Sequence, residues 1–220
     1  MPPYAQPERS QVAEASRHLA TAGLLIGTAG NVSLRFGDRV AITATGTVLA
    51  DLTPDQVTIV DLNGEVVSGD FAPTSELELH LGIYRTLPTT AIVHTHAPKS
   101  TAVACVLGEL PVLHYQQLPL GGATPVVPFF PFGTPELAAA VLDSLSTGKQ
   151  ATLLSNHGAV TLGSSLKEAV DNALLLEWAC TLYLDAASLG TPRALTPEQQ
   201  QAVLEVTLRT AYGTTKPVRP

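Results

Sequence analysis

Hydrophobic and polar positions follow a helical period at the start of the chain. Residues 8–22 carry apolar side chains at helical spacing, and Gly23 follows them. A helix that stops before a glycine is typical of a C-terminal cap, so a helix is predicted over residues 8–22.

The pattern then changes to the alternation that is typical of strands, and it does so in two pairs. Each pair consists of two short alternating runs around a two-residue turn signal, Gly37-Asp38 in the first and Asn63-Gly64 in the second. Such an arrangement predicts a β-hairpin. The runs are residues 32–36 and 39–44 in the first pair, and residues 57–61 and 65–67 in the second.

Helices and single strands alternate in the rest of the chain. Thr74 or Ser75 is predicted to cap a helix that runs to about Arg85, and Thr134-Pro135-Glu136 starts another, with threonine as its cap and proline at its first position. The proline- and glycine-rich segment 111–131 predicts only short extended pieces. The remaining predicted elements are a strand over 91–96, a short helix from Lys99 to about Val106, strands over 151–155 and 159–162, a long helix from about Ser165 to Ala187, and a final helix from Thr196 to near Tyr212.

This order of elements predicts an α/β fold. Hairpins require antiparallel pairing, and the helices between strands must cover the sheet, so we expect one central, mainly antiparallel sheet with helices on both sides. The chain shows no internal repeat and no linker, and it is expected to form one domain over residues 1–220. Residues 1–7 and 213–220 lack periodicity and contain prolines, which predicts loose tails.

Composition excludes several classes of function. The net charge is −7 with a pI near 5.3, and the 12 lysines and arginines are scattered, so no basic nucleic-acid surface is expected. No apolar stretch approaches the roughly 20 residues of a membrane span. The N-terminus lacks the layout of a signal peptide. Cys105 and Cys180 lie far apart inside apolar runs, which is typical of small buried side chains in a reducing compartment. A cytoplasmic protein is therefore expected.

Candidate metal chemistry centres on three histidines. His94 and His96 are two apart in a predicted strand, so their side chains point to the same face. Two imidazoles on one face suit a borderline metal such as zinc. His157 lies at a break between two apolar strands, where Gly158 would let the backbone turn. With the strand pair it completes the three ligands of a catalytic zinc site.

The alternative interpretations are structural. The strand pair could be two polar residues on a solvated face, although the preceding Ala91-Ile92-Val93 suggests burial. His157 alone would more often be structural. His18, on the first helix, and His114, beside Tyr115, are not included among the ligands.

Glu76 is the candidate acid/base. It falls at the start of a predicted helix, where the helix dipole favours a carboxylate. A plain N-terminal glutamate without chemistry is the ordinary alternative. Glu78 is a competitor for the role, and so is His80, which lies one turn further on and is either a hydrogen-bond partner of Glu76 or a surface residue.

Neutral phosphate donors are concentrated in three places. Thr74 and Ser75 offer hydroxyl and backbone N–H groups at a helix start, a favourable place for an anion. The turn from Gly27 to Asn31, which contains Thr28, and the pair Thr45-Gly46 add further donors. The turn is not a dinucleotide fingerprint, because it follows a helix rather than a strand.

Taken together, these motifs resemble the class II aldolase/adducin family. The resemblance covers nearly the whole chain, including His114-Tyr115, the turn at Phe132-Gly133-Thr134 and the terminal Tyr212-Gly213. The motifs that carry it are, in order, Gly27-Thr-Ala-Gly-Asn-Val-Ser33, Ile42-Thr-Ala-Thr-Gly46, Pro73-Thr-Ser-Glu76, Val93-His-Thr-His96 and Asn156-His-Gly158.

The resemblance implies a three-layer αβα fold, usually assembled as a homotetramer with active sites between subunits. It implies one Zn²⁺ per subunit on His94, His96 and His157, with Glu76 as a resting ligand and then the base. It implies that Asn31, Thr45, Gly46, Thr74 and Ser75 hold a substrate phosphate. Tyr115 would lie at the site, and Tyr212 would reach it from the neighbouring subunit as a proton donor.

The implied reaction is cleavage of a ketose 1-phosphate, of the L-fuculose 1-phosphate type, to dihydroxyacetone phosphate and an aldehyde through a metal-stabilised enediolate. The family also contains sugar-phosphate 4-epimerases, dehydratases, decarboxylases and non-catalytic adducin-like modules. Glu76 stands where an epimerase has aspartate, and adducin-like modules lose metal ligands that are intact in this chain.

Two departures from the aldolase pattern bear on the substrate. Thr74 replaces the usual serine but keeps the hydroxyl, so phosphate binding is expected to survive. The loop Gln116-Gln-Leu-Pro-Leu120 differs from the expected run of small residues, so the preferred aldehyde is open.

Overall fold

A nine-stranded sheet forms the centre of the protein in a computed structural model, which describes residues 4–210. The strand order is β4-β3-β2-β1-β5-β9-β8-β7-β6; β7 and β8 are parallel, and the other neighbouring strands of the described residues are antiparallel. The predicted mainly antiparallel sheet is therefore confirmed. The strands are β1 (Asn31–Phe36), β2 (Arg39–Thr43), β3 (Val57–Asp61), β4 (Val66–Ser68), β5 (Ala91–Thr95), β6 (Glu109–Leu110), β7 (Thr124–Val127), β8 (Ala151–Leu154) and β9 (Gly158–Gly163).

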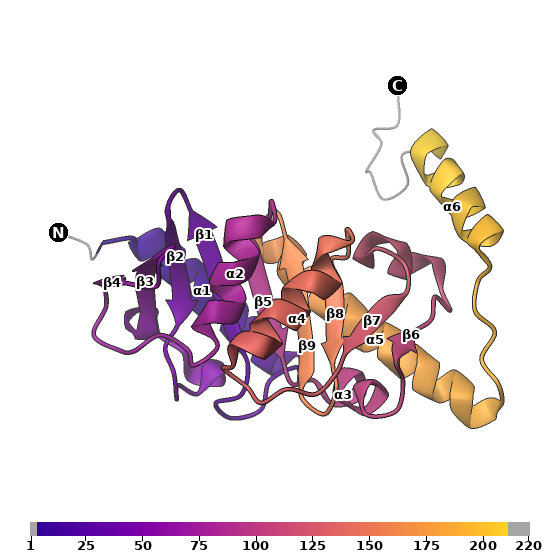
Figure 1. Ribbon diagram of the computed structural model, residues 1–220, viewed down its shortest axis with the longest axis horizontal. Coiled ribbons are helices and arrows are strands. Elements are labelled where there is room, and N and C mark those ends of the chain that lie inside the picture. The colour runs from indigo at the N-terminus through magenta and orange to yellow at the C-terminus, as the bar shows by residue number, and fades with distance from the viewer. Residues whose placement is uncertain (1–3, 211–220) are drawn as a thin grey trace, which may run out of the picture.

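Helices cover both faces of this sheet, giving three layers (Figure 1). One face carries α1, α3 and α5, and the other carries α2 and α4. The α-helices are α1 (Gln6–Thr21), α2 (Leu77–Thr86), α3 (Pro98–Ala104), α4 (Pro135–Ser146), α5 (Leu166–Leu189) and α6 (Pro197–Thr210), and three 3-10 helices are η1 (Leu49–Asp51), η2 (Pro54–Gln56) and η3 (Tyr115–Leu120). None of the helices in residues 4–210 has both the length and the apolar character needed to cross a membrane.

The core has two layers because the strands alternate. In β5, Val93 packs with residues of α1 and α5, whereas Ile92 packs with residues of α2 and α4. The next residue on the α2 side is His94, which is completely buried. The alternation of β5 therefore places His94 in the core layer under α2.

Two predicted helix ends were wrong. The helix α2 begins at Leu77 with Glu76 as its N-cap residue, rather than being capped by Thr74 or Ser75. The reason is that Thr74 is still extended, and its N–H donates to the Thr43 carbonyl of β2 at 3.0 Å. The first helix starts at Gln6, inside the predicted loose segment 1–7, and Arg9 in that helix donates to the Tyr4 carbonyl at 3.1 Å. Residues 1–3 and 211–220 lie outside the described part, so the rest of the predicted tails stays untested.

The segment 111–131 and one cysteine also differ from expectation. Residues 115–120 form η3 rather than an extended piece, because the His114 ring caps its start by accepting from the Gln116 N–H at 3.2 Å. Cys180 is buried as predicted, but Cys105 is exposed because it follows the last residue of α3 at the surface.

The C-terminal helix α6 stands apart from the layers, beyond the β6 end of the sheet (Figure 1). It has no buried residue, and Leu204, Val206 and Leu208 are exposed.

Candidate active site

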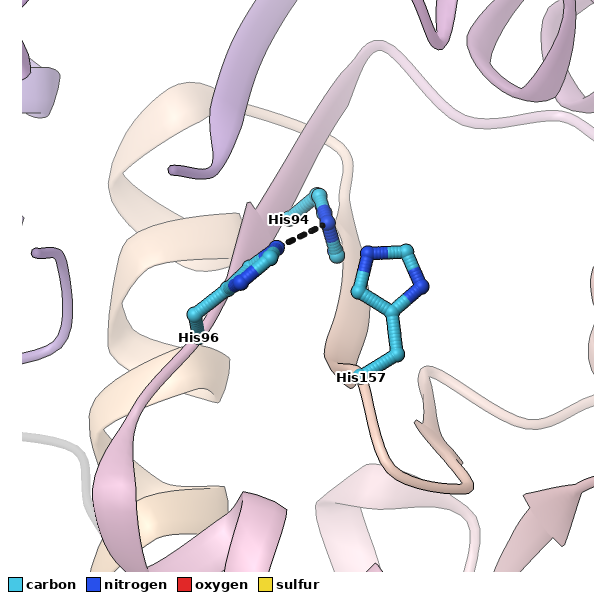
Figure 2. Close-up of side chains that lie close together, drawn as sticks. All are labelled: His94, His96 and His157. Carbon is cyan, nitrogen blue, oxygen red and sulfur yellow. Dashed lines mark hydrogen bonds between the residues drawn. The ribbon is translucent and has the colours of Figure 1, made fainter. Parts of the chain in front are cut away.

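Three imidazole rings meet at the end of β5. Their ring centroids are 4.8 to 4.9 Å apart, and one nitrogen from each ring lies within 4.8 Å of the others. The rings belong to His94, His96 and His157, and Figure 2 shows them gathered around one point. The structure therefore brings together the three histidines that the sequence singled out.

The pairing of the strands and the turn between β8 and β9 determine where these rings lie. His94 is the cross-strand partner of Asn31 on β1 and of Val160 on β9. His157 is carried by the turn between β8 and β9, where Asn156 has a left-handed φ of 56°. Gly158 does not make this turn as predicted; it is the first residue of β9, and a Cβ there would lie 2.1 Å from the Thr95 carbonyl oxygen. Its missing side chain lets the two strands approach closely.

The Glu76 carboxylate completes the cluster from the start of α2. Its Oε2 lies 3.1 Å from Nε2 of His94, and its Oε1 lies 3.7 Å from Nε2 of His157. Asn31 donates from Nδ2 to Oε2 at 2.9 Å. The carboxylate is buried, which is costly for a charge without compensation.

The protonation of His94 follows from its contacts. Its Nδ1 lies 2.9 Å from the Ala159 carbonyl oxygen, which can only accept, so Nδ1 carries a proton. A neutral His94 then presents a lone pair at Nε2. That atom faces Nε2 of His96 at 3.0 Å as well as the Glu76 carboxylate.

The pKa values of these groups depend on one another. Burial would raise the pKa of Glu76, but the charge and hydrogen bond of His94 and the Asn31 amide hold it well below its usual range. Burial would lower the pKa of His94, yet the Glu76 carboxylate raises it above its usual value. Burial and the neighbouring imidazoles lower the pKa of His96 to about 3 and also lower that of His157. A positive charge between these groups is therefore strongly favoured.

The donor set fits a divalent cation. Acceptor atoms of His94, His96 and Glu76 converge, and the buried Oε1 of Glu76 has no hydrogen-bond donor among residues 4–210. Three imidazoles and one carboxylate are typical zinc ligands. The Nδ1–H of His94 donates to a backbone carbonyl, as is usual for a metal-ligating histidine.

A cavity of about 600 Å³ opens above this cluster. All six residues predicted to hold phosphate line it, together with Glu76, His96 and His157; the six are Thr28, Asn31, Thr45, Gly46, Thr74 and Ser75. Backbone hydrogen bonds hold two of its loops together, from the Thr45 N–H to the Ala72 carbonyl and from the Thr74 N–H to the Thr43 carbonyl, each at 3.0 Å. No lysine or arginine of residues 4–210 lines the cavity, so its polar wall consists of neutral donors.

Tyr115, one of the two predicted tyrosines, does not line this cavity. It starts η3 and lines grooves beside α6, with its ring stacked on His114 at a centroid distance of 4.4 Å. Within one chain it does not join the three-histidine cluster. Tyr212 lies outside the described residues. His18 is exposed on α1 and His114 caps η3, so neither belongs to the three-histidine cluster of the described residues.

Part of the cavity was not predicted from the sequence. Phe129 and Phe132 line the cavity with 61% and 70% of their surface exposed. Neither has a periodic signal, because both lie in an irregular loop. His80, expected to be either a hydrogen-bond partner of Glu76 or a surface residue, is completely buried and is linked to Glu76 through Asn31.

Comparison with known proteins supports the geometry. The family profile for the Class II Aldolase and Adducin N-terminal domain matches residues 10–184. The chain is 36% identical over 199 residues to a 5-methylthioribulose-1-phosphate/5-deoxyribulose-1-phosphate aldolase of Rhodospirillum rubrum, covering 90% of this chain and 89% of that one. It is 34% identical to the L-fuculose phosphate aldolase of Escherichia coli K12, covering 92% and 94% of the two chains.

A solved structure of an L-fuculose 1-phosphate aldolase superposes with a TM-score of 0.88 at 28% identity, covering 94% of this chain and 98% of that chain. The predicted αβα architecture and the predicted resemblance to the class II aldolase/adducin family are confirmed.

Proposed function

Because this chain belongs to the class II aldolase and adducin family, we propose that it is a zinc-dependent aldolase that cleaves a ketose 1-phosphate to dihydroxyacetone phosphate and an aldehyde. The observation that carries the proposal is the convergence of three imidazoles and a buried carboxylate beneath a cavity with neutral polar donors. His94, His96, His157 and Glu76 would hold one zinc ion per subunit. A zinc ion there supplies Lewis acidity that polarises the ketose carbonyl and stabilises developing negative charge.

The phosphate is assigned to the polar wall of the cavity. Thr28, Thr45, Gly46 and Ser75 are exposed and line the cavity, and the hydroxyl groups of the two threonines and of Ser75, with the N–H of Gly46, can surround phosphate oxygens. Buried Thr74 and Asn31 complete that wall. Neutral donors bind phosphate without a competing cation beside the metal ligands.

Glu76 is assigned the transfer of the carbon-bound proton. In the condensation direction it removes the carbon-bound proton of dihydroxyacetone phosphate; in cleavage it returns that proton to the enediolate left when the carbon–carbon bond breaks. Its low pKa in the metal-free protein depends on a protonated His94. A ligating His94 has no proton on Nε2, and the positive charge of the metal would then take over its role in keeping Glu76 ionised.

The hydroxyl proton of the aldehyde half needs a second group. Its oxygen loses a proton as the carbonyl forms, and we assign that proton to Tyr212 of a neighbouring subunit, with Tyr115 beside it. This assignment goes with a proposed homotetramer whose active sites lie between subunits. The exposed apolar side chains of α6, including Leu204 and Leu208, support association because such surface is costly in water. A monomer in solution with full activity would contradict it.

The aldehyde half is proposed to carry an apolar tail. Phe129 and Phe132 present aromatic surface to the cavity, and that surface favours a methyl or methylthio group over a charged one. The Rhodospirillum relative is named for a methylthio and a deoxy ketose phosphate, which supports the same class of substrate.

A cytoplasmic location is part of the proposal and agrees with the absence of a disulfide between the two cysteines.

The deciding experiment is a screen of ketose 1-phosphates for release of dihydroxyacetone phosphate, before and after chelation of metal. Release that stops on chelation and returns with zinc is expected, with 5-deoxy and 5-methylthio ketoses among the best substrates. Isomerised, dehydrated or decarboxylated products would instead identify an epimerase, a dehydratase or a decarboxylase of the same family. No turnover and no metal would identify an adducin-like module.

A further inference from the structure

A chain of buried polar side chains leads away from Glu76 into the core. Strand β1 contributes Asn31 and Ser33, two apart on one face, and the segment that begins α2 contributes Glu76, His80 and Tyr84, four apart on one face. None of the five is more than 5% exposed. The two faces interdigitate, so each strand residue lies between two helix-face residues.

Every neighbouring pair in this series of five side chains is hydrogen bonded. Tyr84 Oη lies 2.8 Å from Ser33 Oγ, and Ser33 Oγ lies 2.7 Å from His80 Nδ1. His80 Nε2 lies 2.5 Å from Asn31 Oδ1, and Asn31 Nδ2 lies 2.9 Å from Glu76 Oε2. An alternative acceptor for Tyr84, the Thr90 carbonyl, is farther away at 3.4 Å.

The direction of each hydrogen bond follows from the carboxylate. An ionised Glu76 only accepts, so Asn31 must turn its amino group toward Glu76 and its oxygen toward His80. His80 must therefore donate from Nε2. Burial lowers the pKa of His80 to about 3, so the ring is neutral and its Nδ1 must accept from Ser33. Ser33 in turn accepts from Tyr84.

We propose that Tyr84, Ser33 and His80 form a one-directional hydrogen-bond relay that fixes the side-chain amide of Asn31, and that His80 is thereby a positioning residue for Glu76. The relay occupies Oε2 of the carboxylate and leaves Oε1, which has no donor among the described residues, as the oxygen free to accept a proton. A flipped Asn31 would instead place its oxygen against the carboxylate and repel it.

The relay also accounts for a polar layer that costs stability. Burying an imidazole, a hydroxyl and a phenol is unfavourable unless all are paired, and in this chain each finds a partner within the relay. Because a half-satisfied network is worse than an apolar core, the loss of one member should disturb its neighbours. The effect on turnover rests on the proposed role of Glu76, whereas the proton positions do not.

The first test is the tautomer of His80. In the full chain labelled with ¹⁵N-histidine, correlation of ring protons with ring nitrogens near neutral pH is expected to show a protonated Nε2 and an unprotonated Nδ1, assigned by comparison with His80→Gln. A proton on Nδ1, or a doubly protonated ring, would overturn the relay. This measurement requires neither metal nor substrate.

The second test is replacement of His80. His80→Phe cannot donate to Asn31, and kcat/KM is expected to fall about 10–100-fold, mainly in kcat, as for lost outer-shell partners of metal ligands. His80→Gln keeps one donor and one acceptor at similar separation and should recover at least about tenfold of that loss. Equal losses in the two variants, or a change in KM alone, would contradict a positioning role.

Ser33→Ala keeps the proposal testable if His80→Phe does not fold. It removes the donor to Nδ1 while Asn31 still accepts from Nε2, so the Nδ1 signal of His80 should shift and Nε2 should stay protonated. Ser16→Ala is the matched control, since Ser16 is equally buried and donates to the Val12 carbonyl outside the relay. Identical His80 spectra in wild type and Ser33→Ala would overturn the relay. Wild-type protein with the expected tautomer but no zinc and no aldolase activity would refute the proposed function alone.

Discussion

At the centre of the sheet, where β1, β5 and β9 meet the start of α2, polar side chains are buried and bonded to one another. At the end formed by η3 and α6, apolar side chains are exposed: Leu208 keeps 84% of its surface and Trp178 keeps 41%. The polar groups of the first region are paired within a single chain, whereas the second region, called the incomplete end below, is the one that we propose to be covered by a neighbouring subunit.

This difference indicates that the two regions have different parts in the proposed reaction. The proposed metal ligands and the proposed phosphate wall come from strands and loops whose positions are fixed by strand register and hydrogen bonds. The residues assigned to the aldehyde side, Tyr115 and Tyr212, belong to the incomplete end or follow it. Substitutions at the centre should therefore remove the metal or the chemistry, and changes at the end should alter turnover alone.

The largest effect is expected from His96→Ala. It removes a ligand from the open side of the cluster, so the protein should lose both zinc and activity, by more than the 10–100-fold typical of an outer-shell loss. Metal content of purified protein and the rate of release of dihydroxyacetone phosphate measure this. His18→Ala, on the exposed surface of α1, is the control. An active, metal-free His96→Ala protein would remove the metal from the mechanism.

Glu76→Gln should separate metal binding from chemistry. Three imidazoles remain, so zinc should stay, whereas an amide cannot accept the carbon-bound proton and kcat should fall about 10²–10⁴-fold. Exchange of the carbon-bound proton of dihydroxyacetone phosphate with solvent reports this step directly. Unchanged exchange in Glu76→Gln would move the base to another residue.

Removal of residues 211–220 tests the incomplete end. The truncated protein should keep its zinc and its proton exchange and lose cleavage by about 10²-fold, because the group proposed to take up the hydroxyl proton is missing. Loss of metal together with activity would show that the two regions are not separable in this way.

The smallest effect is expected in the pH dependence of stability. The pKa of His80 falls from 6.5 to about 3 on folding because the ring is buried. The unfolded chain therefore takes up a proton that the native protein does not, and stability should fall as pH decreases from about 6.5 toward 3. Thermal unfolding of metal-free His80→Gln should show a weaker decline over this range than the wild type. An equal change in His18→Gln would contradict the assignment to the buried ring.

The sequence predicted the parts of this site that depend on short-range rules. The spacing of His94 and His96 and the alternation of β5 were enough to place two of the clustered histidines on one face. The hairpin signals were enough for the antiparallel sheet. Glu76, however, lies one step outside its helix, because Thr74 pairs with β2, and no local signal reports such a long-range hydrogen bond.

The hydrogen-bond relay and the two phenylalanines of the cavity could be identified only from the three-dimensional structure. Ser33 looks like an ordinary polar position on a half-exposed strand, and only the packing of α2 over β1 buries it. Phe129 and Phe132 lie in a loop whose path depends on distant contacts, such as Gly133 against the Ser75 carbonyl, where a Cβ would come within 2.9 Å. Cys105 was misplaced because burial at a helix end is decided by its neighbours.

The most direct test is a crystal structure of the protein grown with zinc, with anomalous scattering measured at the zinc edge. A single zinc per subunit is expected, bound by one nitrogen each from His94, His96 and His157 and, without substrate, by the Glu76 carboxylate. Rings that point to different places, or a zinc bound elsewhere in a protein that cleaves its substrate after complete chelation, would contradict the assignment of this cluster as the catalytic centre.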